Sequence, residues 1–222
     1  MLERYLPEAD QRKLIAAAAN THDPYAQRDA AIMRALLYSG CRVGEFSRIS
    51  IAAALHAIHS RRLVLPAAHR KGGKRDHAPL ATQALVEALK DLLRIRHVIT
   101  GNATAAVDPA ESLVVNRYGA RLSVRSFQLR IKYWGQIAAI GKDVTPHFMR
   151  HSRAHNIMRK SNAQDPRGIV QRELGHVSIA STTIYTQPAE HEVRAALERT
   201  DARPAARKRD AIRQFRAMGV TA

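Results

Sequence analysis

Apolar residues recur at three- and four-residue intervals along much of the chain, which is the spacing of one face of an α-helix. Within residues 25–38, Ile32, Met33 and Leu36 form such a stripe, and Ser39-Gly40 supplies a stop signal. The same reading predicts a helix over 7–20, a short helix that begins near Arg42, and helices over 82–96, 124–140, 178–186 and 189–200. The chain is therefore expected to be mostly helical.

Two more helices are indicated by their first residues. Thr145-Pro146 and Asp165-Pro166 each place a capping residue before a proline, and proline is well tolerated at the first helical position. Gly175 is expected to end the second of these helices, because glycine readily adopts the left-handed conformation found at helix C-termini.

The segment 62–80 has a different pattern. Residues 62–65 read as a strand, the turn Lys71-Gly72-Gly73-Lys74 follows, and residues 76–80 read as the returning strand. Residues 113–115 are a further short strand. The predicted fold class is mainly α with a small antiparallel β-sheet (α+β).

The charge of the chain points to a polyanionic partner. Among 222 residues there are 36 Lys and Arg against 19 Asp and Glu, which gives a formal net charge of +17. Each phosphate that such a surface neutralises releases a counterion, so binding to DNA or RNA would depend strongly on salt. A soluble basic protein without a nucleic-acid ligand, or a ribosome-associated one, is the alternative.

Cysteine usage and hydropathy bear on the compartment. Cys41 is the single cysteine, so no intramolecular disulfide can form, which fits a reducing environment. There is no signal-peptide pattern and no apolar run near the roughly 18 residues of a membrane span. We expect a cytoplasmic protein.

Breaking and resealing a phosphodiester without a cofactor makes specific chemical demands. It needs a nucleophile that can be displaced again, such as tyrosine, and fixed cations around the non-bridging oxygens. It also needs an acid that protonates the leaving oxygen. Arginine suits the cation role, because its planar guanidinium donates two hydrogen bonds at once and stays charged.

Five motifs in the chain carry such residues, and in their order they resemble the tyrosine recombinase (phage integrase) family. They are Tyr38-Ser39-Gly40-Cys41-Arg42-Val43-Gly44-Glu45-Phe46, Lys71-Gly72-Gly73-Lys74 with Ala78-Pro79-Leu80, Thr145-Pro146-His147-Phe148-Met149-Arg150-His151, Leu174-Gly175-His176, and Thr182-Thr183-Ile184-Tyr185-Thr186. The nine-residue step from His176 to Tyr185 is also usual in the family. The resemblance covers roughly residues 3–200 and implies the fold of the family's catalytic domain.

The resemblance implies that Tyr185 attacks a DNA phosphate, forms a 3′-phosphotyrosyl link and frees a 5′-hydroxyl. It also implies that Arg42 and Arg150 clamp the non-bridging oxygens. For Tyr185 the alternative is packing at a helix edge. For the two arginines it is an ordinary place on a basic surface.

The resemblance implies roles for three further residues. His147 would accept the tyrosine proton or orient the phosphate, and His176 would donate a hydrogen bond to it. Either could instead be a structural histidine. Lys71 would protonate the leaving 5′ oxygen, although a solvated turn lysine is the alternative and Lys74 could be confused with it.

The remaining candidates would bind DNA or brace the site. Glu45 is expected to brace Arg42 or its helix rather than perform chemistry. His147, His151 and His155 repeat every four residues, but no suitable carboxylate or cysteine set lies nearby in sequence, so we expect no metal. Plausible contacts to backbone phosphates, each of which could also be a solvated charge, are Arg70, Lys74, Arg75, Arg121 and Arg125.

Residues 1–200 are expected to form the catalytic domain, and 201–222 a basic tail. The tail could dock on a neighbouring protomer, bind DNA or fray. Most family members carry an additional N-terminal helical domain, and because the pattern begins almost at Met1 we expect the catalytic domain alone. The apolar residues 51–55 replace the acidic residue that the family usually has after its first arginine motif.

Taken together, these features predict a site-specific DNA recombinase that acts on double-stranded DNA without metal or nucleotide cofactor, as a homo-oligomer, with a tetramer implied by the family. A type IB topoisomerase-like enzyme is one alternative, since it shares this chemistry. A catalytically decayed DNA-binding protein is the other. The target site, and whether the outcome is integration, excision, inversion or resolution, cannot be read from the sequence.

Overall fold

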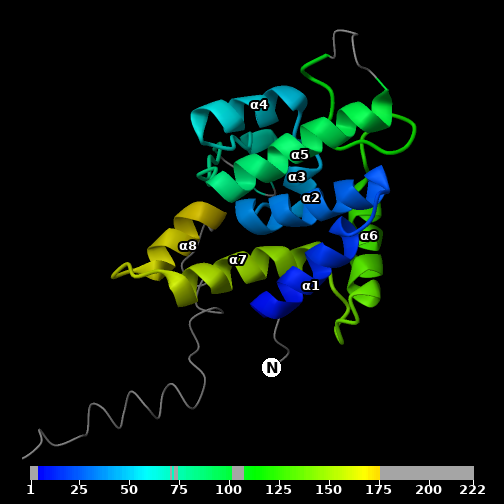
Figure 1. Ribbon diagram of the computed structural model, residues 1–222. Helices are drawn as coiled ribbons and strands as arrows, with labels where there is room; N and C mark the ends of the chain where they lie inside the picture. The colour runs from blue at the N-terminus through cyan, green and yellow to red at the C-terminus, as the bar shows by residue number, and fades with distance from the viewer. Residues whose placement is uncertain (1–4, 71, 73–74, 102–107, 176–222) are drawn as a thin grey trace, which may run out of the picture. The chain divides into compact units, whose positions relative to one another are not determined.

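The computed structural model describes residues 5–70, 72, 75–101 and 108–175, and these belong to one compact unit of the chain. Its elements are helical (Figure 1). They are α1 (Glu8–Ala19), α2 (Pro24–Ser39), α3 (Val43–Phe46), α4 (Ile51–Ser60), the 3-10 turn η1 (Ala67–His69), α5 (Gln83–Thr100), α6 (Val124–Ile137), α7 (Pro146–Lys160) and α8 (Pro166–Leu174). The helices predicted over 178–186 and 189–200, and the domain boundary at residue 200, lie outside the described residues.

Helix α2 lies at the centre of the packing. It contacts α1, α5, α6 and α7, and in Figure 1 it runs between α5 and α7. Asp23 begins it by accepting hydrogen bonds from the backbone N–H groups of Tyr25 and Ala26, each at 3.1 Å, with Pro24 at the first helical position. Gly40 ends it in the left-handed conformation at φ +63°. The predicted helix over 25–38 is confirmed.

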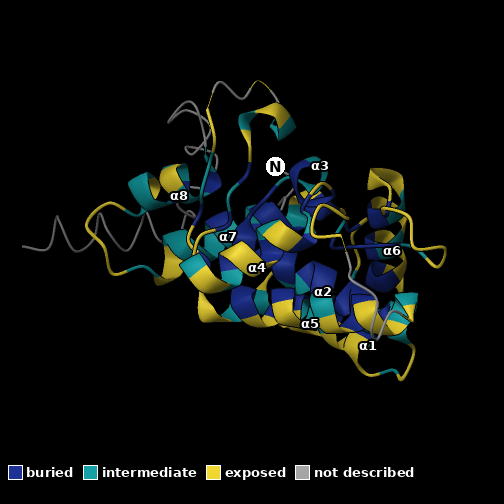
Figure 2. Cartoon of the chain, turned by 90° about the horizontal axis from the view of Figure 1, so that it is seen from above, coloured by how far each residue is buried: buried dark blue, intermediate teal, exposed yellow. Residues whose placement is uncertain are grey.

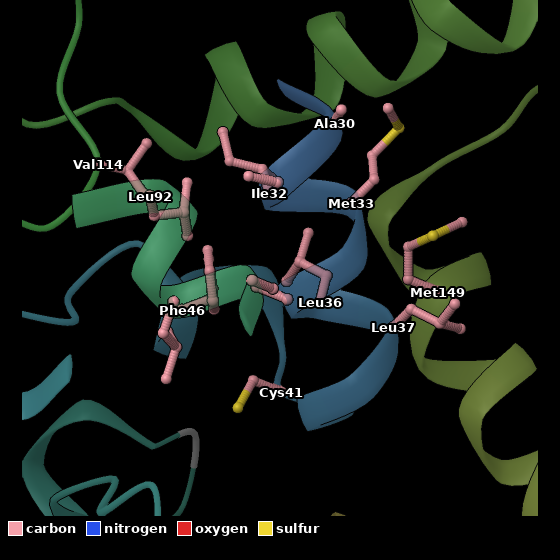
Figure 3. Close-up of a cluster of buried hydrophobic side chains, with 14 of the residues drawn as sticks. Ala30, Ile32, Met33, Leu36, Leu37, Cys41, Phe46, Leu92, Val114 and Met149 are labelled. Atoms are coloured by element: carbon pink, nitrogen blue, oxygen red, sulfur yellow. The ribbon is translucent and has the colours of Figure 1, made fainter. Parts of the chain in front are cut away.

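The hydrophobic core forms around this helix. Figure 3 draws some of its buried side chains, and there Leu37 of α2 lies beside Met149 of α7. Phe46 packs edge-on against Phe127 of α6, with ring centroids 6.0 Å apart. Figure 2, coloured by burial, shows exposed residues on the outer sides of the surrounding helices. The apolar stripes read from the sequence are therefore the faces that pack together.

Helix α4 is not among the helices that the pattern predicts. Residues 51–55 are uniformly apolar, so they lack the polar positions that make a helical period visible. The local signal is Ser50, whose hydroxyl accepts a hydrogen bond from Ala53 N at 3.2 Å and caps the helix. Ile51, Ala54 and Ala57 are its buried residues.

The predicted small antiparallel sheet is not confirmed, because the described residues form isolated antiparallel bridges instead of strands. Arg62 bridges Leu80 and Leu65 bridges His77, so the two arms of the segment pair in one hairpin register. Pro79 stands between these bridges and has no backbone N–H, so the ladder bond expected from that position cannot form. The pairing is therefore interrupted.

The strand predicted over 113–115 is not confirmed either. Leu113 and Val114 are buried, but the antiparallel bridges join Ser50 to Ser112 and Val115 to Arg121, on either side of them. Each bridge involves a different partner segment, so no continuous ladder develops.

One buried ionic network lies within the core. The carboxylate of Asp29 on α2 is 2% exposed and accepts hydrogen bonds from three side chains. Oδ1 accepts from Arg28 Nη2 at 2.9 Å, while Oδ2 accepts from Arg130 Nε at 2.5 Å and from Trp134 Nε1 at 2.9 Å. Because Arg130 and Trp134 belong to α6, this carboxylate joins α2 to α6.

Within the described residues, no helix combines the length and the apolar character that a membrane crossing requires.

Candidate active site

Arg150 connects three motifs that are far apart in the sequence. It lies on α7 and is 5% exposed. Its Nη1 donates a hydrogen bond to Gly40 O at 2.5 Å, and its Nη2 donates one to Leu174 O at 2.8 Å. Gly40 ends α2 two residues before Arg42, and Leu174 ends α8 two residues before His176 in the sequence. One guanidinium therefore holds the ends of two helices together.

The contact between these helix ends favours glycine at position 40. The residue has φ +63°, where a side chain is strained. A Cβ atom on it would also lie 2.3 Å from Leu174 Cδ2, which is far inside contact distance. The glycine that the sequence indicates as a helix stop thus also permits α2 and α8 to meet.

Arg42 stands where α3 begins and is held by Glu45. Its Nη1 donates to Glu45 Oε1 at 3.1 Å, and its backbone N donates to Glu45 Oε2 at 2.9 Å. The Glu45 side chain is 4% exposed, whereas that of Arg42 is 35% exposed. The bracing role that the sequence indicates for Glu45 is confirmed, and the Arg42 guanidinium keeps access to solvent.

His147 completes a cluster with the two arginines. It lies one turn before Arg150 on α7, so both project from one side of the helix. The pKa of the His147 imidazole is lowered from its ordinary value, first by burial and then by the positive charges of Arg150 and Arg42. The structure therefore brings Arg42, His147 and Arg150 together, and keeps His147 mainly neutral at neutral pH.

The segment around the predicted hairpin docks on the end of α8. His77 Nε2 lies 2.9 Å from Glu173 O, and Leu80 N donates to Glu173 Oε2 at 3.0 Å. No pattern in the sequence indicates Glu173 or His77 as site residues, because 96 residues separate them. Their contact places residues 77–80 next to the end of α8.

The other predicted site residues divide into three groups. Lys71, Lys74, His176 and Tyr185 lie outside the described residues. Arg75, Arg121 and Arg125 are exposed, as a phosphate contact requires. Arg70 is different, since its side chain is 10% exposed and contacts protein groups.

Two other groups that could take part in chemistry, the Cys41 thiol and the His155 ring, are packed against the protein. Burial raises the pKa of the Cys41 thiol to about 12, which makes it a poor nucleophile. The His155 ring stacks on Tyr5, with centroids 3.7 Å apart and planes 13° apart. No group of three His, Cys, Asp or Glu residues suited to a metal ion occurs in the part of the chain that the structure describes.

The domain is mainly helical and gathers two arginines and a histidine from separate motifs, which are side chains suited to binding phosphate esters or similar anions. The sequence profile of the phage integrase family matches residues 4–192, so the chain belongs to the phage integrase family.

Relatives of known name support this assignment. The chain is 36% identical over 168 residues to tyrosine recombinase XerC of Vibrio vulnificus (strain YJ016), which covers 75% of this chain and 48% of that protein. It is 33% identical over 217 residues to XerC of Azotobacter vinelandii, covering 94% of this chain and 65% of that protein. The chain thus spans about half to two thirds of the length of these relatives.

Solved structures share the fold. The crystal structure of XerA recombinase matches with a TM-score of 0.68 and 28% identity, over 90% of this chain and 65% of that one. The pre-cleavage complex of the XerH site-specific recombinase with its difH substrate matches with a TM-score of 0.62 and 18% identity, over 88% of this chain and 52% of that one. The fold is that of tyrosine recombinases, as the sequence motifs imply.

Proposed function

We propose that this chain is a site-specific DNA recombinase that cleaves and rejoins strands through a 3′-phosphotyrosyl intermediate formed by Tyr185. The observation that carries the proposal is the cluster of Arg42, His147 and Arg150, which Arg150 itself joins to the start of the His176 motif. The similarity to XerC, and the XerH structure with its DNA substrate, support DNA as the substrate class.

In the proposed reaction the Tyr185 oxygen attacks phosphorus while the bond from phosphorus to the 5′ oxygen breaks. Arg42 and Arg150 stabilise the negative charge that develops on the non-bridging oxygens. His147 accepts the tyrosine proton, His176 donates a hydrogen bond to the phosphate, and Lys71 gives a proton to the leaving oxygen. The phosphotyrosyl bond conserves the energy of the phosphodiester, so no nucleotide is consumed, and rejoining is the reverse of these steps.

The proposed assembly is a homo-oligomer on double-stranded DNA, with a tetramer as the synaptic form. A λ integrase fragment of similar fold was crystallised as a dimer bound to a core site, which supports oligomers on DNA. The basic tail 201–222 is proposed to dock on a neighbouring protomer. Arg75, Arg121 and Arg125, which are exposed, and Lys74 are proposed to contact the DNA backbone.

Trapping on nicked DNA tests the function. The substrate is a pool of duplexes with a fixed nick beside a randomised sequence, in which cleavage releases a short fragment and religation is blocked. We expect a covalent protein–DNA adduct that survives denaturation, a phosphotyrosyl peptide that contains Tyr185, and no adduct with Tyr185→Phe. Absence of any adduct from the unsubstituted protein would point to a DNA-binding protein without cleavage activity.

The sequences recovered from the adducts then separate a recombinase from a type IB topoisomerase. Two duplexes that carry the recovered site are expected to exchange their marked ends. Relaxation of supercoiled DNA without exchange would favour the topoisomerase.

The lowered pKa of His147 predicts how the rate of cleavage falls on the acid side of its pH profile. Neutral imidazole accepts a proton and imidazolium does not, so the second-order rate constant for cleavage should fall as pH drops through the lowered pKa. We therefore expect a flat rate at neutral pH and a decline whose midpoint lies below the ordinary histidine value near 6.5. Single-turnover cleavage with DNA below saturation measures it.

The matched variant is His147→Asn, which should be slower and should lack this acid limb. The pKa of His77 is also lowered, mainly by burial. An acid limb that is unchanged in His147→Asn would assign the titration to another group and contradict the proton-acceptor role.

A further inference from the structure

Arg70 and Arg75 stand five residues apart, near the two ends of the same turn, yet the structure places them differently. Arg75 is exposed. The Arg70 side chain is 10% exposed, although arginine is almost never withdrawn from water unless it is paired. The surroundings of Arg70 therefore indicate a role within the protein rather than on its DNA-facing surface.

The Arg70 guanidinium contacts three separate segments. Its Nη1 donates to Arg75 O at 3.0 Å, which closes the turn from one arm to the other. Its Nη2 donates to Gly175 O at 3.2 Å, at the residue before His176 in the sequence. Its Nε lies 3.8 Å from Glu45 Oε1, which makes an ion pair with both side chains at most 10% exposed.

Glu45 is thereby shared between two arginines. Its Oε1 accepts a hydrogen bond from Arg42 Nη1 at 3.1 Å and pairs with Arg70 Nε. One carboxylate charge shared between two guanidinium groups orients both and leaves a net positive charge over the three groups. The arginine clamp and the hairpin turn consequently have a common anchor.

Arg70 and His77 approach Gly175 closely at the end of α8. A Cβ atom there would lie 2.7 Å from Arg70 Nη2 and 3.1 Å from the His77 ring, and the residue has φ +63°. Together with the Glu173 contacts to His77 and Leu80, this fixes the base of the hairpin against the end of α8.

We propose that Arg70 is a positioning residue that holds the base of this turn so that Lys71, the next residue in the chain, can protonate the leaving 5′ oxygen. The inference rests on the proposed function. Arg70 ties the start of this turn to Glu45 of α3 and to Gly175 at the end of α8, and Glu45 also holds Arg42. Loss of the anchor should slow protonation of the leaving oxygen while the phosphate clamp remains.

A change of leaving group tests this step directly. In a DNA strand with sulfur in place of the bridging 5′ oxygen, cleavage releases a thiolate that needs no proton, since a thiol has a pKa near 8.5. We expect Arg70→Met to cleave normal DNA about 10²-fold more slowly than the unsubstituted protein at saturating DNA. On the sulfur substrate its rate should approach that of the unsubstituted protein. A fold defect or a lost phosphate contact would slow both substrates alike.

Two control variants accompany this measurement. Arg62→Met removes the same charge from an exposed position of the hairpin and should cleave both substrates normally. Arg70→Lys keeps a positive charge near Glu45 and should stay folded, but a single ammonium cannot reproduce the fork that spans two carbonyls. It should therefore show the same defect on normal DNA and the same recovery on the sulfur substrate.

Two results would overturn the inference. One is equal slowing of Arg70→Met and Arg70→Lys on both substrates. The other is a drop of about one in the slope of log affinity against log salt for Arg70→Met, which marks a lost phosphate contact. Failure of the unsubstituted protein to cleave either substrate would instead refute the proposed function itself.

Discussion

Replacement of Arg150 by alanine is expected to lower the rate of DNA cleavage by about 10³–10⁵-fold, the range found when an arginine that stabilises a phosphoryl transition state is removed. The guanidinium is already oriented by its hydrogen bonds to Gly40 O and Leu174 O. Little reorganisation is therefore needed when charge develops on the phosphate. Single-turnover cleavage at saturating DNA measures the loss.

DNA affinity should change much less than the cleavage rate, because the chain carries a formal net charge of +17 and one arginine contributes only one of many phosphate interactions. Arg159→Ala is the matched control, since it removes the same charge from an exposed position on the same helix. Its cleavage rate should be normal. Losses of equal size in binding and in cleavage for Arg150→Ala would contradict the transition-state role.

Arg150→Ala also removes the hydrogen-bond donor of two backbone carbonyls, so its stability has to be measured alongside its activity. Arg150→Lys separates the two effects. Lysine keeps the charge, but a single ammonium cannot bridge both carbonyls as the guanidinium fork does. We expect a large loss of cleavage with this variant as well, although smaller than with alanine.

Replacement of Asp29 by alanine is expected to reduce the free energy of unfolding by about 3–5 kcal/mol. Asp29 is 2% exposed, and its removal leaves the buried Arg28 guanidinium without its carboxylate. Arg130 and Trp134 on α6 lose their acceptor at the same time. Urea denaturation should show a lower midpoint with an unchanged m-value.

Asp91→Ala is the matched control for this prediction. Asp91 also pairs with two arginines, Arg34 and Arg94, but its side chain is 33% exposed and the pairs lie at the surface. Its loss should cost at most about 1 kcal/mol. Similar costs for the two aspartate variants would show that the buried network contributes no more than surface pairs do.

Local sequence signals predict most helix ends well, because each signal acts within a few residues of the backbone that it caps. Asp23-Pro24 and Gly40 bound α2, and Asp165-Pro166 with Gly175 bounds α8. Helix α4 was missed because a uniformly apolar segment shows no period. The sheet was overestimated because Pro79 interrupts the pairing of two arms whose composition favours strands.

By itself, the sequence determined the family, the order of the motifs, and the pairing of His147 with Arg150 on one helix face. Only the tertiary structure decided that Arg150 joins Gly40 to Leu174, and that Arg70 faces the protein while Arg75 faces solvent. The physical reason is the sequence separation between the residues that make contact. Residue spacing reports contacts within a turn or two of backbone, whereas Arg150 reaches Gly40 across 110 residues and Arg70 reaches Gly175 across 105. Such contacts depend on how the helices pack, and similar arginines along a basic chain carry no local mark of which one will be buried.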